Sequence, residues 1–71
     1  MSKEIKSNVT GTVWKILVNV GDSVQEDQDV VILESMKMEM MVPSELSGKV
    51  KEIKVKVDDF VQEGDTVIVL E

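Results

Sequence analysis

The sequence predicts an all-β protein, a flattened barrel or two-sheet sandwich with pseudo-twofold symmetry. Val makes up about a fifth of the 71 residues, and Val, Ile and Leu together number roughly two dozen, against one Trp and one Phe. β-branched side chains are stiff and fit pleated sheet better than helix. A chain of this length has room for one small domain, and we expect residues 1–71 to form it.

An internal repeat is the second observation. When residues 11–34 are aligned on residues 48–71, a shift of 37 positions, about a dozen pairs are identical. The pairs are Gly11/Gly48, Val13/Val50, Ile16/Ile53, Val18/Val55, Val20/Val57, Asp22/Asp59, Val24/Val61, Gln25/Gln62, Glu26/Glu63, Val30/Val67, Leu33/Leu70 and Glu34/Glu71. Each half alone would leave an apolar face bare, and packing the halves together covers both faces.

The first strand of each half carries an irregularity at the same place. Residues 52–57 alternate charged and apolar side chains, the period of a half-buried strand. Lys51 and Glu52 are adjacent and both polar, so the phase slips there and predicts a β-bulge. Trp14 and Lys15 mark the same slip in the first half. Because Trp14 aligns with Lys51, we expect its ring to be partly exposed.

The remainder of each half predicts turns and then a buried strand. Residues 20–29 and 57–64 are acidic and rich in turn-forming residues. Residues 30–33 and 66–70 are continuous apolar runs, typical of strands that are buried on both faces.

The segment Ser35–Glu45 lies between the two copies and aligns with neither. Four of the five Met residues of the chain fall within six positions here. Because predicted strands flank the segment, we expect a β-hairpin with Lys37 at or beside its turn.

Composition excludes several kinds of chemistry. The chain has no Cys, His or Arg, so a disulfide, a thiolate nucleophile, a Ser-His-Asp triad and an ordinary zinc site are all excluded. The net charge of −6 disfavours binding to nucleic acid or anionic membranes. No apolar run is long enough for a membrane span and no signal peptide opens the chain, so we expect a cytoplasmic protein, or one of an organelle matrix if a targeting peptide has been removed.

Two charged clusters carry no strong prediction. Asp27-Gln28-Asp29 and Asp58-Asp59 lack the spacing of a calcium loop, so we predict no metal site. Four lysines, Lys49, Lys51, Lys54 and Lys56, form a basic stripe that is either a solvated strand face or a contact for an acidic partner.

Lys37 is the candidate functional residue. A lysine on a tight turn projects from the body of the protein, and lysine is a common target of acylation. Its ammonium group is a poor nucleophile in water unless an enzyme assists. Methionine clusters usually fill cores, and a single lysine on a turn is usually only solvated. Here two soft apolar side chains, Met36 and Met38, flank the lysine at the centre of a pseudo-symmetric chain, which indicates a site that a second protein recognises.

The residues Glu34-Ser35-Met36-Lys37-Met38 resemble the biotinyl attachment motif of biotin carboxyl carrier proteins and of the biotin domains of carboxylases. Gly11, the Gly21-Asp22 step, Pro43, Gly48 and the Glu63-Gly64-Asp65 turn resemble further landmarks of the biotinyl/lipoyl family. The resemblance covers essentially the whole chain.

The resemblance implies a function. A biotin protein ligase would form biotinyl-adenylate and transfer biotin to Lys37, and the domain would shuttle carboxybiotin between a biotin carboxylase and a carboxyltransferase. The domain itself would be a non-catalytic carrier, monomeric in isolation. Glu34, Ser35, Met36, Met38 and Glu39 would form the ligase recognition site, although the two glutamates have an alternative role in solubilising an apolar tip.

Departures from the family pattern and two alternatives remain. Asp27 and Asp58 stand where glycines are expected, which puts the shapes of those turns in doubt. The first half has no insertion resembling the thumb of some bacterial carboxyl carrier subunits, so the chain is more similar to a carboxylase C-terminal domain or to a short free-standing attachment protein. The Met1-Ser2-Lys3 start favours the free-standing protein. The alternatives are a lipoyl carrier for acyl or aminomethyl transfer and an unmodified interaction or spacer module.

Overall fold

The computed structural model describes residues 3–71 and confirms the all-β prediction, with eight strands and no helix in that range. Met1 and Ser2, on which the free-standing prediction partly rests, lie outside the described residues. None of residues 3–71 forms a helix that could cross a membrane.

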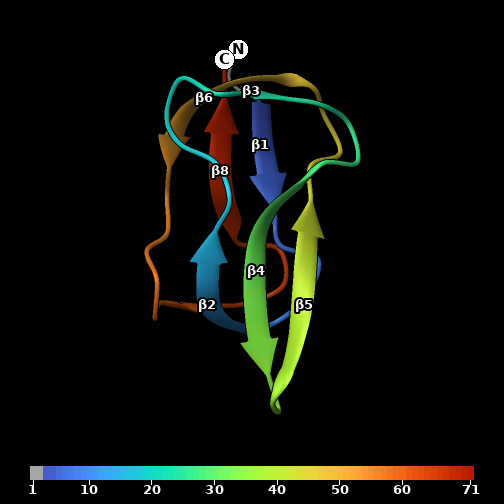
Figure 1. Cartoon of the computed structure of the whole chain (residues 1–71), viewed down its shortest axis with the longest axis vertical. Helices are drawn as coiled ribbons and strands as arrows, with labels where there is room; N and C mark the ends of the chain where they lie inside the picture. Colours follow the sequence, from blue (N-terminus) through green and yellow to red (C-terminus); the bar gives the residue numbers. More distant parts are fainter. Residues whose placement is uncertain (1–2) are drawn as a thin grey trace.

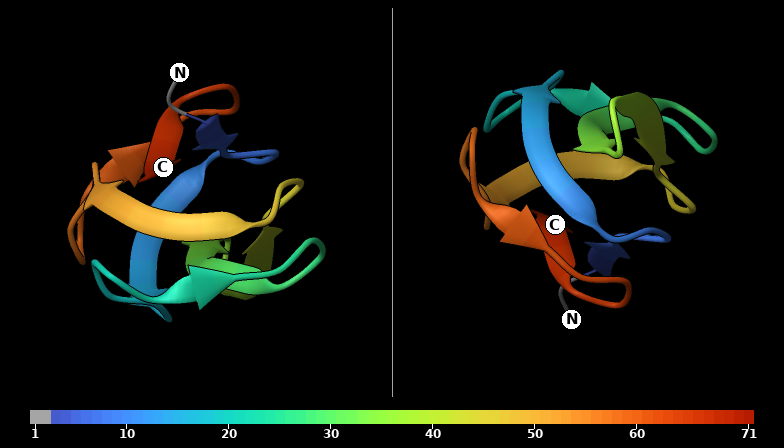
Figure 2. Two further views of the ribbon diagram at one scale, coloured as in Figure 1. Left: turned by 90° about the horizontal axis from the view of Figure 1, so that it is seen from above. Right: turned by 90° about the horizontal axis from the view of Figure 1, so that it is seen from below.

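The strands form two four-stranded antiparallel sheets that face each other (Figure 1 and Figure 2). One sheet has the order β1-β8-β6-β3, and the other has the order β5-β4-β2-β7. The bounds are β1 Lys3–Lys6, β2 Gly11–Ile16, β3 Ser23–Val24, β4 Asp29–Ser35, β5 Met38–Pro43, β6 Gly48–Ile53, β7 Phe60–Val61 and β8 Thr66–Leu70. We call the second sheet the hairpin sheet and the first sheet the opposite sheet.

The two halves of the repeat exchange their shortest strands. β3 belongs to the first half but pairs with β6, and β7 belongs to the second half but pairs with β2. The backbone hydrogen bonds around these pairs also obey the shift of 37. Gly21 N donates to Val50 O at 2.9 Å, and the equivalent Asp58 N donates to Val13 O at 2.8 Å. Pseudo-twofold symmetry therefore extends to individual hydrogen bonds, as the repeat predicts.

The repeat is longer than the sequence alignment indicated. β1 and β5 occupy equivalent places at the ends of their sheets, so the prediction that Ser35–Glu45 belongs to neither half is wrong for β5. Equivalent residues include Ser7 and Ser44, both buried, whose hydroxyls donate to the carbonyls of Val9 and Leu46. The sequence does not reveal the equivalence of β1 and β5, because β1 is polar where β5 is rich in methionine.

Both predicted bulges are present. The register shifts between Val13 and Lys15 in the β2–β4 pair and between Val50 and Glu52 in the β6–β8 pair. Trp14, the extra residue of the first bulge, is 48% exposed, as its alignment with Lys51 predicts.

The strand predicted to run through Val57 ends earlier. β6 stops at Ile53, and Val57 is exposed. The Asp59 carboxylate accepts a hydrogen bond from Lys56 N at 2.9 Å, so a turn over residues 56–59 replaces the last residues of the alternating pattern. The two-residue strands β3 and β7 lie within the segments predicted as turns.

The core between the sheets is aliphatic. Residues 30–33 and 67–70 are all buried, as predicted, and all of them except Ile32 and Val69 belong to this core. Further buried residues are Ile5, Val13, Val18, Val24, Val42, Val50, Val55 and Val61. Within residues 3–71, every buried side-chain nitrogen or oxygen has a hydrogen-bond partner.

The turns that carry Asp in place of Gly adopt the glycine conformation. Asp27 has φ 70°, and its equivalent Gly64 has φ 93°; Asp58 has φ 79°, and its equivalent Gly21 has φ 95°. Asp is among the residues that tolerate this region at the lowest cost. The doubt about these turns is resolved, because each Asp retains the shape of its Gly counterpart.

Gly11 and Gly48 are equivalent in sequence but differ in their surroundings. A Cβ on Gly11 would lie 2.8 Å from the carbonyl oxygen of Glu34, whereas a Cβ on Gly48 would have its nearest neighbours at 3.4 Å. We predict that Gly11→Ala lowers the free energy of unfolding by about 1–3 kcal/mol, the usual cost of overpacking. Gly48→Ala changes it by less than about 1 kcal/mol. Urea unfolding of the two variants checks this, and equal losses would contradict the contact.

Candidate functional site

The hairpin of β4 and β5 projects beyond the rest of the molecule and confirms the predicted hairpin. Its tip lies at one end of the long axis, while both chain termini lie at the other end (Figure 1). The molecule measures 34 × 19 × 19 Å along its principal axes. The tip is therefore the part of the fold most accessible to another protein.

Met36 and Lys37 form the turn. Ser35 pairs with Met38 as the last pair of the hairpin, so only two residues connect the strands. Both have positive φ, 52° for Met36 and 65° for Lys37, which is the signature of a type I′ turn. This turn matches the right-handed twist of the strands, but it favours Asn-Gly. Met and Lys in this region cost about 1–2 kcal/mol each, so their presence points to function rather than to local stability.

The predicted recognition residues gather around the tip but divide between two faces. Glu34 and Glu39 are a directly opposed cross-strand pair on the outward face. Ser35 and Met38, the adjacent pair, point to the other face because successive strand residues alternate. Opposed like charges destabilise a hairpin slightly. A partner that contacts all five predicted residues would have to reach around the tip.

Gly11 packs against the hairpin close to its tip. The close approach of its Cα to the Glu34 carbonyl lets β2 run tightly against β4, three residues before Lys37. In the sequence, Gly11 stands out only through the repeat and the family resemblance. Its steric role was not evident there, because the contact joins residues that are far apart in the chain.

The chemistry at the tip is that of one exposed amine. Met36 is 92% exposed, and Lys37 is exposed as well. Among the described residues, the Lys37 ammonium has no ion pair or hydrogen bond, and no three His, Cys, Asp or Glu side chains form a metal-ligand group. An unpaired primary amine on a projecting turn fits a group held through an amide bond.

The family model described as "Biotin-requiring enzyme", which covers biotin and lipoyl domains, matches residues 1–70.

The chain belongs to the biotin/lipoyl family.

This membership confirms the predicted resemblance of the chain to the biotinyl/lipoyl family. Two relatives within the family are a biotin carboxyl carrier protein of Streptococcus mutans and a biotin/lipoyl attachment protein of Bacillus subtilis. The first is 66% identical over 29 residues, covering 41% of this chain and 22% of the relative. The second is 46% identical over 38 residues, covering 54% of this chain and 52% of the relative. The match thus spans about half or less of each relative.

A solved structure contains the same fold as this chain. The urea carboxylase of Kluyveromyces lactis contains a region that superposes on this entire chain with a TM-score of 0.90 and 41% sequence identity. That region is 6% of the carboxylase chain.

The strain of the turn can be measured directly. We predict that Met36→Asn raises the free energy of unfolding by about 1 kcal/mol, because Asn tolerates positive φ and the exposed Met36 side chain loses little packing. Met36→Val should lower it, since a β-branched residue is disfavoured there. Urea unfolding compares the two variants, and equal stabilities would show that the turn is unstrained.

Proposed function

We propose that this chain is a biotin carrier domain and that biotin is attached to Nζ of Lys37. The observation that carries the proposal is the position of Lys37 on the two-residue turn of the projecting hairpin, in a chain of the biotin/lipoyl family. The other lysines lie on strands or on turns of the body of the fold. Lys37 alone combines projection with flanking apolar side chains.

The attachment step requires an enzyme. A biotin protein ligase activates the carboxyl group of biotin as biotinyl-adenylate, with loss of pyrophosphate from ATP. The Lys37 amine, after loss of a proton, attacks the acyl carbon, so the new amide bond forms as AMP leaves. The chain contributes the exposed amine and a turn that holds it away from competing carboxylates. The ligase residues that activate the amine belong to the partner.

The proposed domain is a carrier and not itself an enzyme. Bound biotin supplies a ureido nitrogen that accepts and releases a carboxyl group, chemistry that belongs to the cofactor and the partner enzymes. This chain holds the attachment point on a stable hairpin and keeps the cofactor at a high local concentration near each active site. We propose a biotin carboxylase and a carboxyltransferase as the partners, in keeping with the carrier and carboxylase names of its relatives.

A lipoyl carrier is the second candidate, because the family includes both types. Lipoyl domains usually have Asp before the lysine and a small residue after it, whereas this chain has Met36 and Met38. The methionines favour biotin, as do the names of the relatives. An unmodified spacer module is disfavoured because it has no need of a strained turn that presents a lysine.

Further parts of the proposal remain predictions. We propose that Glu34, Ser35, Met36, Met38 and Glu39 contact the ligase, that the isolated chain is one monomeric domain, and that it acts in the cytoplasm.

Lys37→Arg tests the attachment site. We predict that co-expression with a biotin protein ligase and biotin adds one biotinyl group to the wild-type chain and none to the variant. The fold should be unaffected, because an exposed turn residue rarely contributes to stability. Intact mass and peptide mapping measure the modification, and Lys49→Arg serves as the matched control. Biotin on any of the other seven lysines, or a lipoyl group on wild type from the native host, would contradict the proposal.

A further inference from the structure

The outward faces of the two sheets differ in character although the sheets are built alike. Three equivalent positions carry Trp14, Met41 and Phe60 on the hairpin sheet, which are 48%, 44% and 65% exposed. Under the shift of 37 residues, their counterparts on the opposite sheet are polar: Lys51, Glu4 and Ser23.

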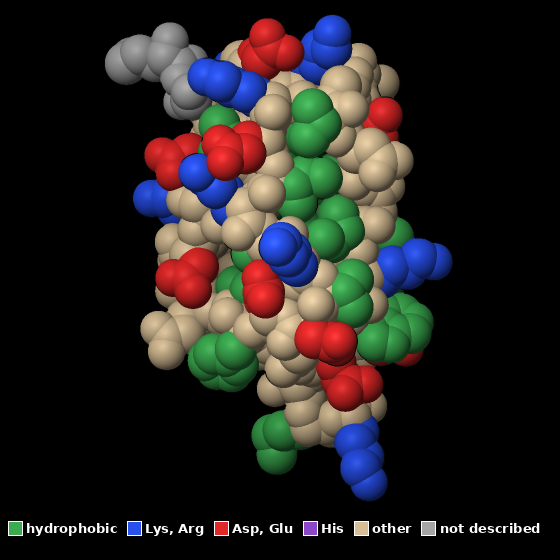
Figure 3. All heavy atoms as spheres, turned by 90° about the vertical axis from the view of Figure 1, so that its left-hand side faces the viewer, with side chains coloured by type: hydrophobic (Ala, Val, Ile, Leu, Met, Phe, Trp, Pro, Cys, Tyr) green, Lys and Arg blue, Asp and Glu red, His purple; other side chains and the backbone are tan. Residues whose placement is uncertain are grey.

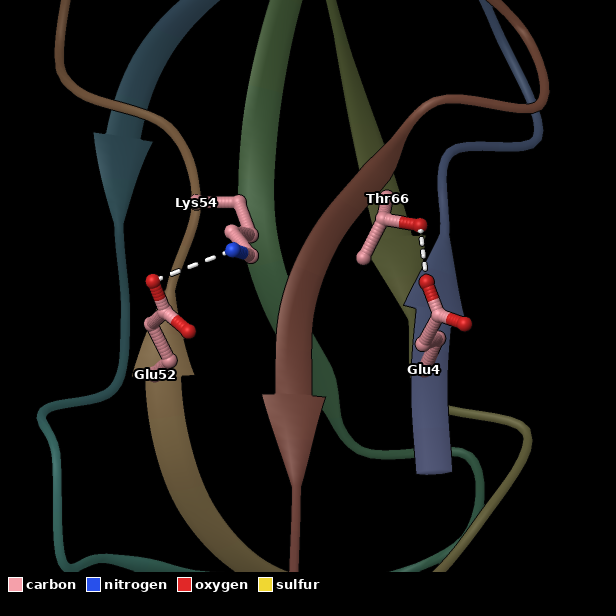
Figure 4. A network of polar contacts seen from close by, with 4 residues as sticks. All are labelled: Glu4, Glu52, Lys54 and Thr66. Atoms are coloured by element: carbon pink, nitrogen blue, oxygen red, sulfur yellow. Dashed lines mark hydrogen bonds and ion pairs between the residues drawn. The ribbon is translucent and has the colours of Figure 1, made fainter. Parts of the chain in front are cut away.

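The fold does not require apolar residues at these positions. Ile32 and its counterpart Val69 face outward from the two sheets and are 7% and 8% exposed. The cross-strand partners of Ile32 are Met41 and Lys15, whereas those of Val69 are Glu4 and Glu52, so Val69 is equally well covered without an apolar neighbour in its row. On the opposite sheet, Lys54 and Glu52 form an ion pair at 3.1 Å, and Thr66 donates to Glu4 at 2.7 Å (Figure 4). Because the opposite sheet is covered without apolar residues at these positions, the apolar side chains of Trp14, Met41 and Phe60 are not needed for folding. Exposed apolar side chains of this kind mark interaction sites.

We define an outer patch as the exposed Trp14, Met41 and Phe60 together with the buried Ile32, and it shares the outward face of the hairpin sheet with Glu34 and Glu39 of the attachment hairpin. Strand pairing aligns Phe60 with Thr12, and Thr12 with Glu34 near the tip. The next row contains Ile32 opposite Met41. Ile32 and Lys37 are five positions apart along the chain, at most roughly 17 Å. Figure 3 shows hydrophobic side chains among the charged ones on the side of the molecule above the hairpin tip.

We propose that the outer patch is a second contact surface for the biotin protein ligase, an inference that rests on the proposed function of Lys37. The ligase must hold the Lys37 amine in its active site, so its footprint on this chain is centred near the tip. A stable interface buries about 800 Å² on each partner, an area roughly 30 Å across. The two-residue turn and its neighbours are too small for that, and the outer patch lies within reach. Large aromatic side chains such as Trp14 are the usual anchors of interfaces.

The charged residues around the outer patch define which partner surface can bind it. Glu34 and Glu39 lie on the same outward face, and Asp58 and Asp59 directly precede Phe60. Lys15 is the single cation in the rows that contain the patch. A second copy of this chain would bring its own carboxylates against these. The fitting partner is a ligase surface with an apolar centre and a basic rim.

The pseudo-symmetry supplies the test. The triple variant Trp14→Lys, Met41→Glu, Phe60→Ser gives the hairpin sheet the residues of the opposite sheet, which that geometry already accommodates, and leaves the net charge unchanged. We expect the KM of purified biotin protein ligase for the chain, with biotin and ATP, to rise about tenfold or more while kcat changes little, because Lys37 and its turn are intact. Thermal unfolding verifies the fold, and Phe60→Ser alone provides a milder variant with a smaller rise in KM.

The matched control places the apolar residues on the opposite sheet: Lys51→Trp, Glu4→Met, Ser23→Phe. It should leave KM unchanged. An unchanged KM in the triple variant, or an equal rise in the control, overturns the assignment. So does a wild-type dimer that the triple variant loses without any change in ligase kinetics, since the patch would then serve self-association. A wild-type chain that accepts no biotin contradicts the proposed function itself, which is a separate outcome.

Discussion

The exchange of β3 and β7 between the halves is the constraint on which the rest of the structure depends. Neither half contains a complete sheet, because β2 of the first half pairs with β7 of the second, and β6 of the second half pairs with β3 of the first. Two hydrogen bonds at each crossing, including Val13 N to Asp59 O and Val50 N to Asp22 O, both at 2.8 Å, tie the halves together. The exchange stacks two bulged, twisted sheets around one aliphatic core. With the body closed in this way, the β4–β5 hairpin can project without contributing further packing at its tip.

The two sheets have nearly the same scaffold, but only the hairpin sheet carries the candidate site. The hairpin turn has no counterpart among residues 3–71, because β1 and β8, the equivalents of β5 and β4, are the first and last strands and no turn joins them. The differences between the sheets then gather around that turn: Gly11 packs against Glu34, the turn residues have positive φ, and apolar side chains face outward. A shared scaffold makes such differences informative, since features required by the fold should appear twice and features required by function need appear only once.

Most of the fold was predictable from the sequence because it depends on local pattern and repetition. The bulges at Trp14 and Lys51, the buried strands and the hairpin around Lys37 each left a signal within a few residues. Three features did not. The equivalence of β1 with β5 is hidden by substitution of methionine for polar residues. The turn at residues 56–59, in which the Asp59 carboxylate accepts a hydrogen bond from Lys56 N, interrupts the alternating pattern, and hydrophobic periodicity does not report it. The close contact of Gly11 with Glu34 depends on a register that only the folded sheet defines.

The central claim is that the turn presents an amine at one defined position, and exchanging its two residues tests this most directly. The variant with Met36→Lys and Lys37→Met retains the composition, charge and two-residue turn but moves the amine by one position. Biotin ligase should label it more slowly than wild type by about tenfold or more, because small displacements of a reacting group have large effects on rate. Labelling of both chains at the same rate, measured by intact mass over time, would contradict the claim and show that the ligase recognises a flexible local sequence.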